Sequence, residues 1–230
     1  MLNITIDAGH GQFENQSPRD SSFFEGTNNY YFALALKREL EKYEDVVVHL
    51  TREKITDNPS LEKRGKLAVN NNSDVFLSVH SNASSSSSAY GVEGYYSVKT
   101  PAAYSLLASL CHAVSDSLPV PKVRRVVTKT SGGKDYYAVL RGSEGVPYSM
   151  LIEMGFHTNT KELGCIRLNE WHDAVAQKQA AVFADFFKLQ KKVDRQYSVV
   201  IKTFKSEQDA ETFLSALKDV LSNAEIVEGS

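Results

Sequence analysis

The segment LNITIDAGHGQ (residues 2–12) decides the fold of this chain, because a short apolar run leads directly into a histidine between two glycines. Ile4 and Ile6 alternate with polar residues, which predicts a strand that ends just before His10. A histidine in that position has three alternative explanations: a turn residue, part of a phosphate-binding loop, or a metal ligand.

The rest of the chain alternates helix-type and strand-type patterns. We predict helices over 30–43 and 61–69, a helix capped by Thr100 that runs past Leu118, and a last helix from Trp171 to Leu189. The predicted strands are 46–50, 75–80, 92–98 and 150–153. This order indicates the α/β class, with a single twisted, largely parallel sheet flanked by helices. Ligands of such sheets bind at the carboxyl ends of the strands.

The composition fits one well-buried domain with a small appendage, since the chain has 230 residues of which 42% are hydrophobic. A net charge of -2 gives no reason to expect nucleic acid or an anionic membrane surface as partner. No apolar run reaches the length of a membrane span, and no signal peptide precedes the first strand pattern. Cys111 and Cys165 lack metal-type or redox-type spacing, which favours two inert thiols.

The phosphate-loop explanation of His10 fails on spacing. Gly9 and Gly11 begin a dinucleotide fingerprint, but no third glycine follows, and the chain has no Walker motif. A serine hydrolase is also excluded, because the Gly-x-Ser-x-Gly elbow is missing. A turn accounts for the glycines but gives no reason for an imidazole between them.

The metal explanation gains from residues at other strand ends. His80 ends the strand VFLSVH, and Glu25 precedes the helix that we expect from Tyr30. Two histidines and one carboxylate leave one position open on a tetrahedral zinc ion, as in hydrolytic zinc sites. Glu153 lies at a strand end between apolar neighbours, a setting that suits a general base. Each residue taken singly is more often structural, so the hypothesis depends on their combination.

Several ordered segments together resemble one family. These segments are IDAGHG, EGTNNYYFALALKREL, LEKRGKLAVNNNSDVFLSVHSN, GVEGYY and DYYAVLRGSEGVPYSMLIEMGFHTN, within residues 2–189. They are similar to the zinc-dependent N-acetylmuramoyl-L-alanine amidases of the amidase type 3 group, which are bacterial and phage cell-wall hydrolases. The resemblance implies zinc ligands at His10, Glu25 and His80, and a catalytic glutamate at Glu153. Glu14 is a second carboxylate near the first ligand, but the sequence context favours Glu25.

The resemblance also implies peptidoglycan as the substrate. The bond cleaved would join the lactyl group of N-acetylmuramic acid to L-alanine, with one zinc ion per catalytic domain. Arg141 is a candidate oxyanion stabiliser or stem-peptide contact, and Asn82 is a candidate for orienting a ligand or the substrate. We expect the enzyme to be made in the cytoplasm and to reach the wall after lysis or release, as a phage endolysin or a mother-cell autolysin.

Two alternative functions remain at this point. One is a non-catalytic wall-binding or regulatory relative, against which the retention of all four residues argues. The other is a zinc carboxypeptidase-like peptidase. Three of the remaining histidines are expected to be structural (His49, His112 and His172). His157 is either a rim residue of the site or a partly exposed helix or loop histidine, and the second interpretation is favoured. Arg64 is expected to make a structural helix contact.

The pattern restarts after a linker over 190–195. Residues 196–230 predict a βαβ appendage, with strands at 197–201 and 224–227 around a helix that Ser206 begins. Its first half resembles the start of the SPOR domain, a glycan-binding module. So short a unit cannot bury a core alone, and we therefore expect it to form a homodimer that binds wall glycan. The alternatives are that it docks on the catalytic domain of its own chain or that it is a truncated module. Residues 1–189 are the predicted catalytic domain.

Overall fold

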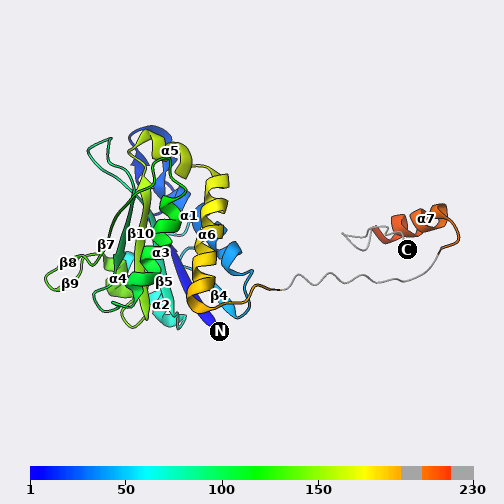
Figure 1. The fold of residues 1–230 in the computed structure, drawn as a ribbon, viewed down its shortest axis with the longest axis horizontal. Coiled ribbons are helices and arrows are strands. Elements are labelled where there is room, and N and C mark those ends of the chain that lie inside the picture. The colour runs from blue at the N-terminus through cyan, green and yellow to red at the C-terminus, as the bar shows by residue number, and fades with distance from the viewer. Residues whose placement is uncertain (193–203, 219–230) are drawn as a thin grey trace. The chain divides into compact units, whose positions relative to one another are not determined.

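A six-stranded sheet forms the centre of the computed structural model, which describes residues 1–192 and 204–218. The strands follow the order β4-β1-β5-β10-β6-β7 (Figure 1). Their bounds are β1 Leu2–Ala8, β4 Val46–Leu50, β5 Val75–Asn82, β6 Val92–Tyr96, β7 Val123–Val127 and β10 Tyr148–Phe156. The first four strands in this order are parallel to one another, while β6 is antiparallel to β10 and parallel to β7. The predicted largely parallel α/β sheet is confirmed.

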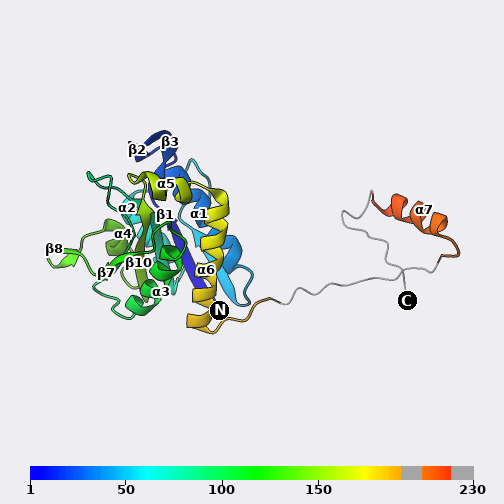
Figure 2. The ribbon, with the colours of Figure 1, turned by 45° about the horizontal axis from the view of Figure 1, so that its top comes forward.

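Two layers of helices cover the sheet (Figure 2). The larger layer contains α1 (Glu25–Leu40), α3 (Ala103–Ser115) and α6 (Asn169–Phe187), which pack with Ile4, Ile6 and Leu77 in the main core. The opposite face carries α2 (Leu61–Asn70) and the short α4 (Ala138–Gly142). A smaller core lies there around Phe76 and Leu151. Alternation along each strand therefore gives the sheet two buried faces.

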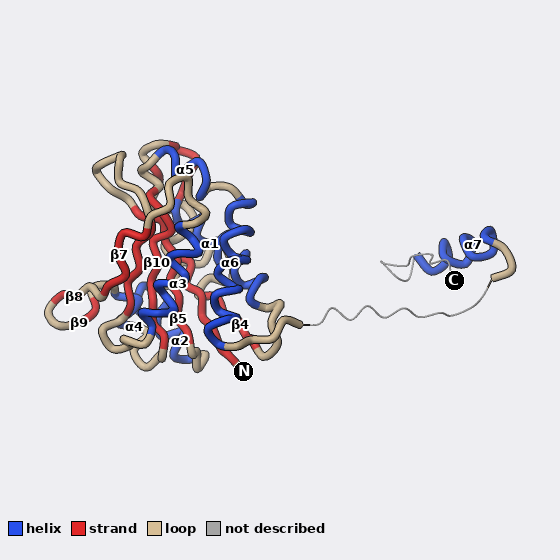
Figure 3. The backbone as a smooth tube through the Cα atoms, in the orientation of Figure 1, coloured by secondary structure: helices blue, strands red, loops and turns tan. Residues whose placement is uncertain are grey.

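Short elements connect the main ones, as Figure 3 shows. They are β2 (Gln16–Ser17), β3 (Asp20–Phe24), β8 (Thr130–Ser131), β9 (Lys134–Asp135) and α5 (Thr160–Ile166). Among the described helices, none combines the length and the apolar composition that crossing a membrane requires.

Two predicted helix starts are wrong. Helix α1 begins at Glu25, five residues before the expected start at Tyr30. Helix α3 begins at Ala103 without a side-chain cap, and the hydroxyl of Thr100 instead donates to the carbonyl of Ser97. The edge strand β7 was not predicted.

The chain divides into two compact units, Met1–Lys192 and Val193–Ser230. The described part of the second unit contains α7 (Glu207–Lys218). Ser206 begins this helix as predicted, because its hydroxyl accepts from the amide of Asp209 at 3.3 Å. The expected strands at 197–201 and 224–227 lie outside the described residues, so the βαβ unit, the SPOR resemblance and the homodimer stay predictions.

Candidate metal centre and active site

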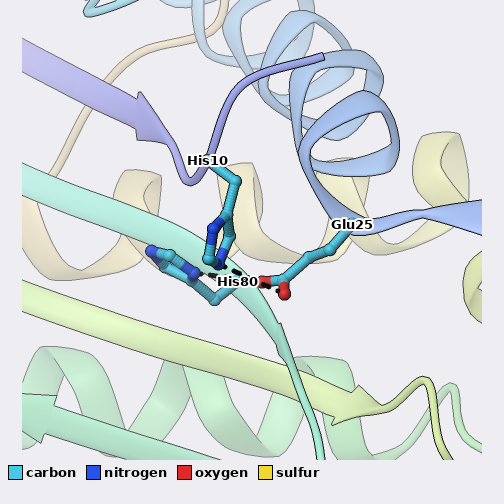
Figure 4. A group of neighbouring side chains, drawn as sticks. All are labelled: His10, Glu25 and His80. Carbon is cyan, nitrogen blue, oxygen red and sulfur yellow. Dashed lines mark hydrogen bonds and ion pairs between the residues drawn. The ribbon is translucent and has the colours of Figure 1, made fainter. Parts of the chain in front are cut away.

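Three side chains from separate elements meet at the carboxyl end of the sheet (Figure 4). His10 follows β1, Glu25 is the first residue of α1, and His80 lies near the end of β5. Their ligand atoms all lie within 4.8 Å of one another. The Oε2 atom of Glu25 is 3.3 Å from Nε2 of His10, and its Oε1 atom is 3.0 Å from Nδ1 of His80. The predicted ligand set is therefore one spatial cluster.

The turn that carries His10 leaves no room for larger side chains. A Cβ atom at Gly9 would lie 2.1 Å from the ring of His80, and one at Gly26 would lie 1.7 Å from the carbonyl oxygen of Gly11. His10 itself has a φ of 64°, a left-handed conformation that is unfavourable for most residues. The buried guanidinium of Arg64 holds this turn by donating to the carbonyls of Ala8 and His10. The glycines are thus required by close packing.

Glu25 is held as a carboxylate. Its side chain is 1% exposed and accepts hydrogen bonds from the backbone amide of Ser81 and from the side-chain amides of Asn15 and Asn29. Burial alone would raise the pKa of Glu25, but hydrogen bonds and charge from His10 and His80 outweigh it and hold that pKa well below its usual range. The buried carboxylate of Glu25, placed between two imidazole rings, therefore favours the binding of a cation.

The donor set fits zinc. Burial opposes the protonation of His80, yet its hydrogen bond to Glu25 and the charge of that carboxylate raise its pKa to about 9. Because a metal ion binds a deprotonated imidazole nitrogen, a metal ion and a proton compete for His80. Two imidazole nitrogens and one carboxylate oxygen are the ligand types of catalytic zinc sites, which keep a further position for water or substrate.

Glu153 lies beside this cluster on β10. It pairs in register with His80 of β5 on one side and with Glu93 of β6 on the other. Its Oε2 atom is buried, and no hydrogen-bond partner for it exists among the described residues. Burial raises the pKa of Glu153 to about 7, against the opposing charge of His80. The carboxyl can thus exchange a proton near neutral pH.

Asn82 and Arg141 lie outside the metal-ligand cluster. The side-chain amide of Asn82 donates to Glu93 at 3.1 Å, which places Asn82 in contact with the neighbour of Glu153. Arg141 is in α4, where its guanidinium donates to the carbonyls of Asp135 and Tyr136 at 2.7 Å each. It lines a separate pocket between α2 and α4, so the structure does not place it with His10 and His80.

His157 is the site residue that the sequence missed. The favoured interpretation as a partly exposed histidine is wrong, because the side chain is 1% exposed. Its Nδ1 atom lies 3.0 Å from the hydroxyl of Ser81 and 4.0 Å from Oε2 of Glu25. Burial lowers the pKa of His157, which favours the neutral form of the imidazole beside the Glu25 carboxylate. In contrast, His172 is structural as expected, with a 2.8 Å hydrogen bond to the carbonyl of Ile166.

A pocket of about 280 Å³ is lined by His10 and His80, the two histidines of the cluster. Its polar lining includes Glu14, Asn58 and Arg64, and its apolar lining includes Leu61 and Val139. Glu14 accepts hydrogen bonds from the amide of Gly11 and from Asn58, both at 2.7 Å, and it is not part of the three-ligand cluster.

Taken together, a largely parallel α/β sheet carries at the carboxyl ends of its strands a cluster of two histidines and one glutamate that could hold a metal ion, with the buried Glu153 carboxyl beside it. Residues 4–183 match the family model described as Amidase_3, N-acetylmuramoyl-L-alanine amidase. The chain belongs to this family of peptidoglycan hydrolases, which confirms the family inferred from the sequence motifs.

Relatives of known identity agree with this assignment. N-acetylmuramoyl-L-alanine amidase CwlM of Bacillus licheniformis is 28% identical over 213 residues, covering 92% of this chain and 79% of the relative. The catalytic domain of CwlV, an N-acetylmuramoyl-L-alanine amidase from Bacillus (Paenibacillus) polymyxa, is 26% identical with a TM-score of 0.71, over 83% of this chain and all of that one. An N-acetylmuramoyl-L-alanine amidase from Clostridium difficile 630 is 28% identical with a TM-score of 0.71, over 81% of this chain and 97% of that one.

Proposed function

We propose that this protein cleaves the amide between the lactyl group of N-acetylmuramic acid and L-alanine, with zinc held by His10, Glu25 and His80 and with Glu153 as general base. Membership of the amidase family supports the reaction. The observation that carries the catalytic assignment is the buried, unpaired Oε2 atom of Glu153 in register with His80.

Each ligand residue is prepared for its role by its surroundings. When bound, the zinc ion supplies Lewis-acid chemistry, which acidifies water and stabilises negative charge on a carbonyl oxygen. Glu25 stays anionic, and the amides of Asn29 and Ser81 fix the direction of its carboxylate. Arg64 fixes His10 through its backbone carbonyl.

Glu153 moves the proton. A carboxyl with a pKa of about 7 can accept a proton from the attacking water and then give it to the nitrogen of L-alanine. The amide nitrogen is a poor leaving group until it is protonated, so both transfers are needed. Asn82 acts indirectly by orienting Glu93, and Arg141 has a structural role in α4 under this proposal.

The test is a digest of purified peptidoglycan with the zinc-loaded protein. The proposal expects new N-terminal L-alanine, whereas a carboxypeptidase-like enzyme would release a terminal amino acid and a wall-binding relative would release nothing. Glu153→Gln should retain zinc and fold but lose on the order of 100-fold or more in rate. Glu144→Gln is the matched control, since that side chain is 71% exposed. Near-normal rates in Glu153→Gln would refute the assignment and make Glu14 the next candidate.

The route to the wall and the role as endolysin or autolysin stay predictions, as does glycan binding by residues 196–230.

A further inference from the structure

Lys129 lies on a cluster of three tyrosines, which we call the tyrosine cluster: Tyr95, Tyr136 and Tyr137. The ammonium nitrogen is 3.9 Å from the ring centroid of Tyr136, 5.4 Å from that of Tyr137 and 5.9 Å from that of Tyr95. The rings contact one another, with centroids 4.9 Å apart for Tyr95 and Tyr137 and 5.2 Å apart for Tyr136 and Tyr137. The cluster therefore favours a position of the lysine side chain over the rings.

The charge of Lys129 is not neutralised. Among the described residues, no carboxylate lies within ion-pair distance of its ammonium group, and the side chain is exposed. Aromatic rings attract a cation through their quadrupole, but they do not cancel its charge. Arg124 and Arg125 differ in this respect, because both approach Glu93, at 2.7 and 3.4 Å. Lys129 thus remains available to an anion from solution.

The tyrosine cluster extends from the catalytic carboxyl to the surface. The hydroxyl of Tyr95 donates to Glu93, the register partner of Glu153, at 2.6 Å. At the other end Tyr136 is 51% exposed. The hairpin of β8 and β9, which follows Lys129, projects from the sheet beside β7 and α4 (Figure 1).

We propose that Lys129 binds a carboxylate of the stem peptide, on the L-alanine side of the scissile amide. This inference rests on the proposed function. In that substrate the lactyl carboxyl is consumed in the amide bond, so the fixed negative charges belong to the peptide. An ammonium already positioned by three rings loses little side-chain entropy when it binds such a group. Lys129 is therefore a specificity residue, which discriminates acidic from amidated stem peptides.

The test compares two soluble muropeptides that differ only in the residue after L-alanine, which carries a free carboxylate in one and a carboxamide in the other. Lys129→Gln should raise KM for the carboxylate substrate about 10-fold, the loss expected for one charge-assisted hydrogen bond, with little change in kcat. The carboxamide substrate should show little change in KM. Lys129→Arg should retain the preference. Lys134→Gln is the control, because it removes an equal charge from the exposed β9 of the same hairpin.

The outcomes separate the two proposals. Equal effects of Lys129→Gln on both muropeptides, or no effect on either, would overturn the carboxylate site while leaving the amidase proposal intact. Failure of the unaltered zinc-loaded protein to cleave either muropeptide would overturn the amidase proposal. In that case calorimetric titration with the two free stem peptides tests the carboxylate site. The proposal requires that the acidic peptide binds more tightly than the amidated one and that Lys129→Gln abolishes this difference.

Discussion

Replacing Arg64 by methionine should destabilise the catalytic unit strongly, although Arg64 is not a metal ligand. Its guanidinium is 1% exposed and pairs with Asp7, which is fully buried, at 2.9 Å. The guanidinium donates five hydrogen bonds in all, to Asp7, Ala8, His10, Asn58 and Pro59. Methionine fills most of the volume but leaves the Asp7 carboxylate without its ion-pair partner.

The size of the effect follows from that unpaired charge. Removing one partner of a buried ion pair costs about 3–5 kcal/mol. For a domain of this size each kcal/mol lowers Tm by about 2–4 °C, so a fall of about 6–20 °C is expected. The lost hydrogen bonds to Ala8 and His10 should also loosen the turn and weaken zinc binding.

Urea and thermal unfolding followed by circular dichroism measure this loss. The double variant Asp7→Asn, Arg64→Met should recover at least about 1 kcal/mol, because an amide can still bond to Thr51 and Ser78 without carrying a charge. Lys66→Met is the control, since its pair with Glu62 is exposed and worth at most about 0.5 kcal/mol. A loss below about 1 kcal/mol in Arg64→Met, or strict additivity in the double variant, would refute the reasoning.

Three further predictions concern the metal, pH and the tail. Gly9→Ala should lower the zinc content, because the added Cβ atom would lie 2.1 Å from the His80 ring. His80→Ala should lose most of the zinc. Full zinc occupancy of either variant, measured by metal analysis, would contradict the prediction for that variant. The value of kcat/KM should rise with pH through about 7, because the protonated Glu153 carboxyl that dominates below this pH cannot act as a base; a flat profile from pH 5 to 8 would exclude this role. Light scattering should find a dimer for the full chain and a monomer for a chain ending at Leu189, and two monomers would exclude the tail as a dimerisation element.

Apolar alternation made most of the sheet predictable, and the exceptions have physical causes. Strand β7 escaped prediction because Arg124 and Arg125 interrupt its apolar pattern, as an edge strand with exposed positions allows. The start of α3 was misplaced because Thr100 and Pro101 form a turn before the helix, and the Thr100 hydroxyl bonds backwards to Ser97. Local capping rules do not distinguish such a turn from the first turn of a helix.

The two histidines of the cluster were predictable because their position along a strand determined where they lie. His10 and His80 follow or end apolar strands, and parallel strands bring such ends to one edge. His157 could not be placed in this way, because the pairing of β10 with β5 shifts after Glu153 and Gly155 adopts a φ of 132°. That irregularity turns the following residues inward, and the amide of His157 then bonds to the carbonyl of Asn82 at 2.9 Å. No pattern of apolar residues in the sequence indicates this irregularity.

The neighbouring side chains explain why Glu153, rather than Glu93, is the candidate base. The two carboxylates are direct cross-strand partners, so position alone does not separate them. Burial would raise the pKa of Glu93, but hydrogen bonds from Tyr95 and Arg124 outweigh it and lower that pKa. In the described part of the chain, Glu153 receives no such partner on Oε2, and burial raises its pKa to about 7. Two adjacent carboxyls thus acquire different protonation behaviour from their neighbours. The residue left without a donor is the one that can exchange a proton with water and substrate.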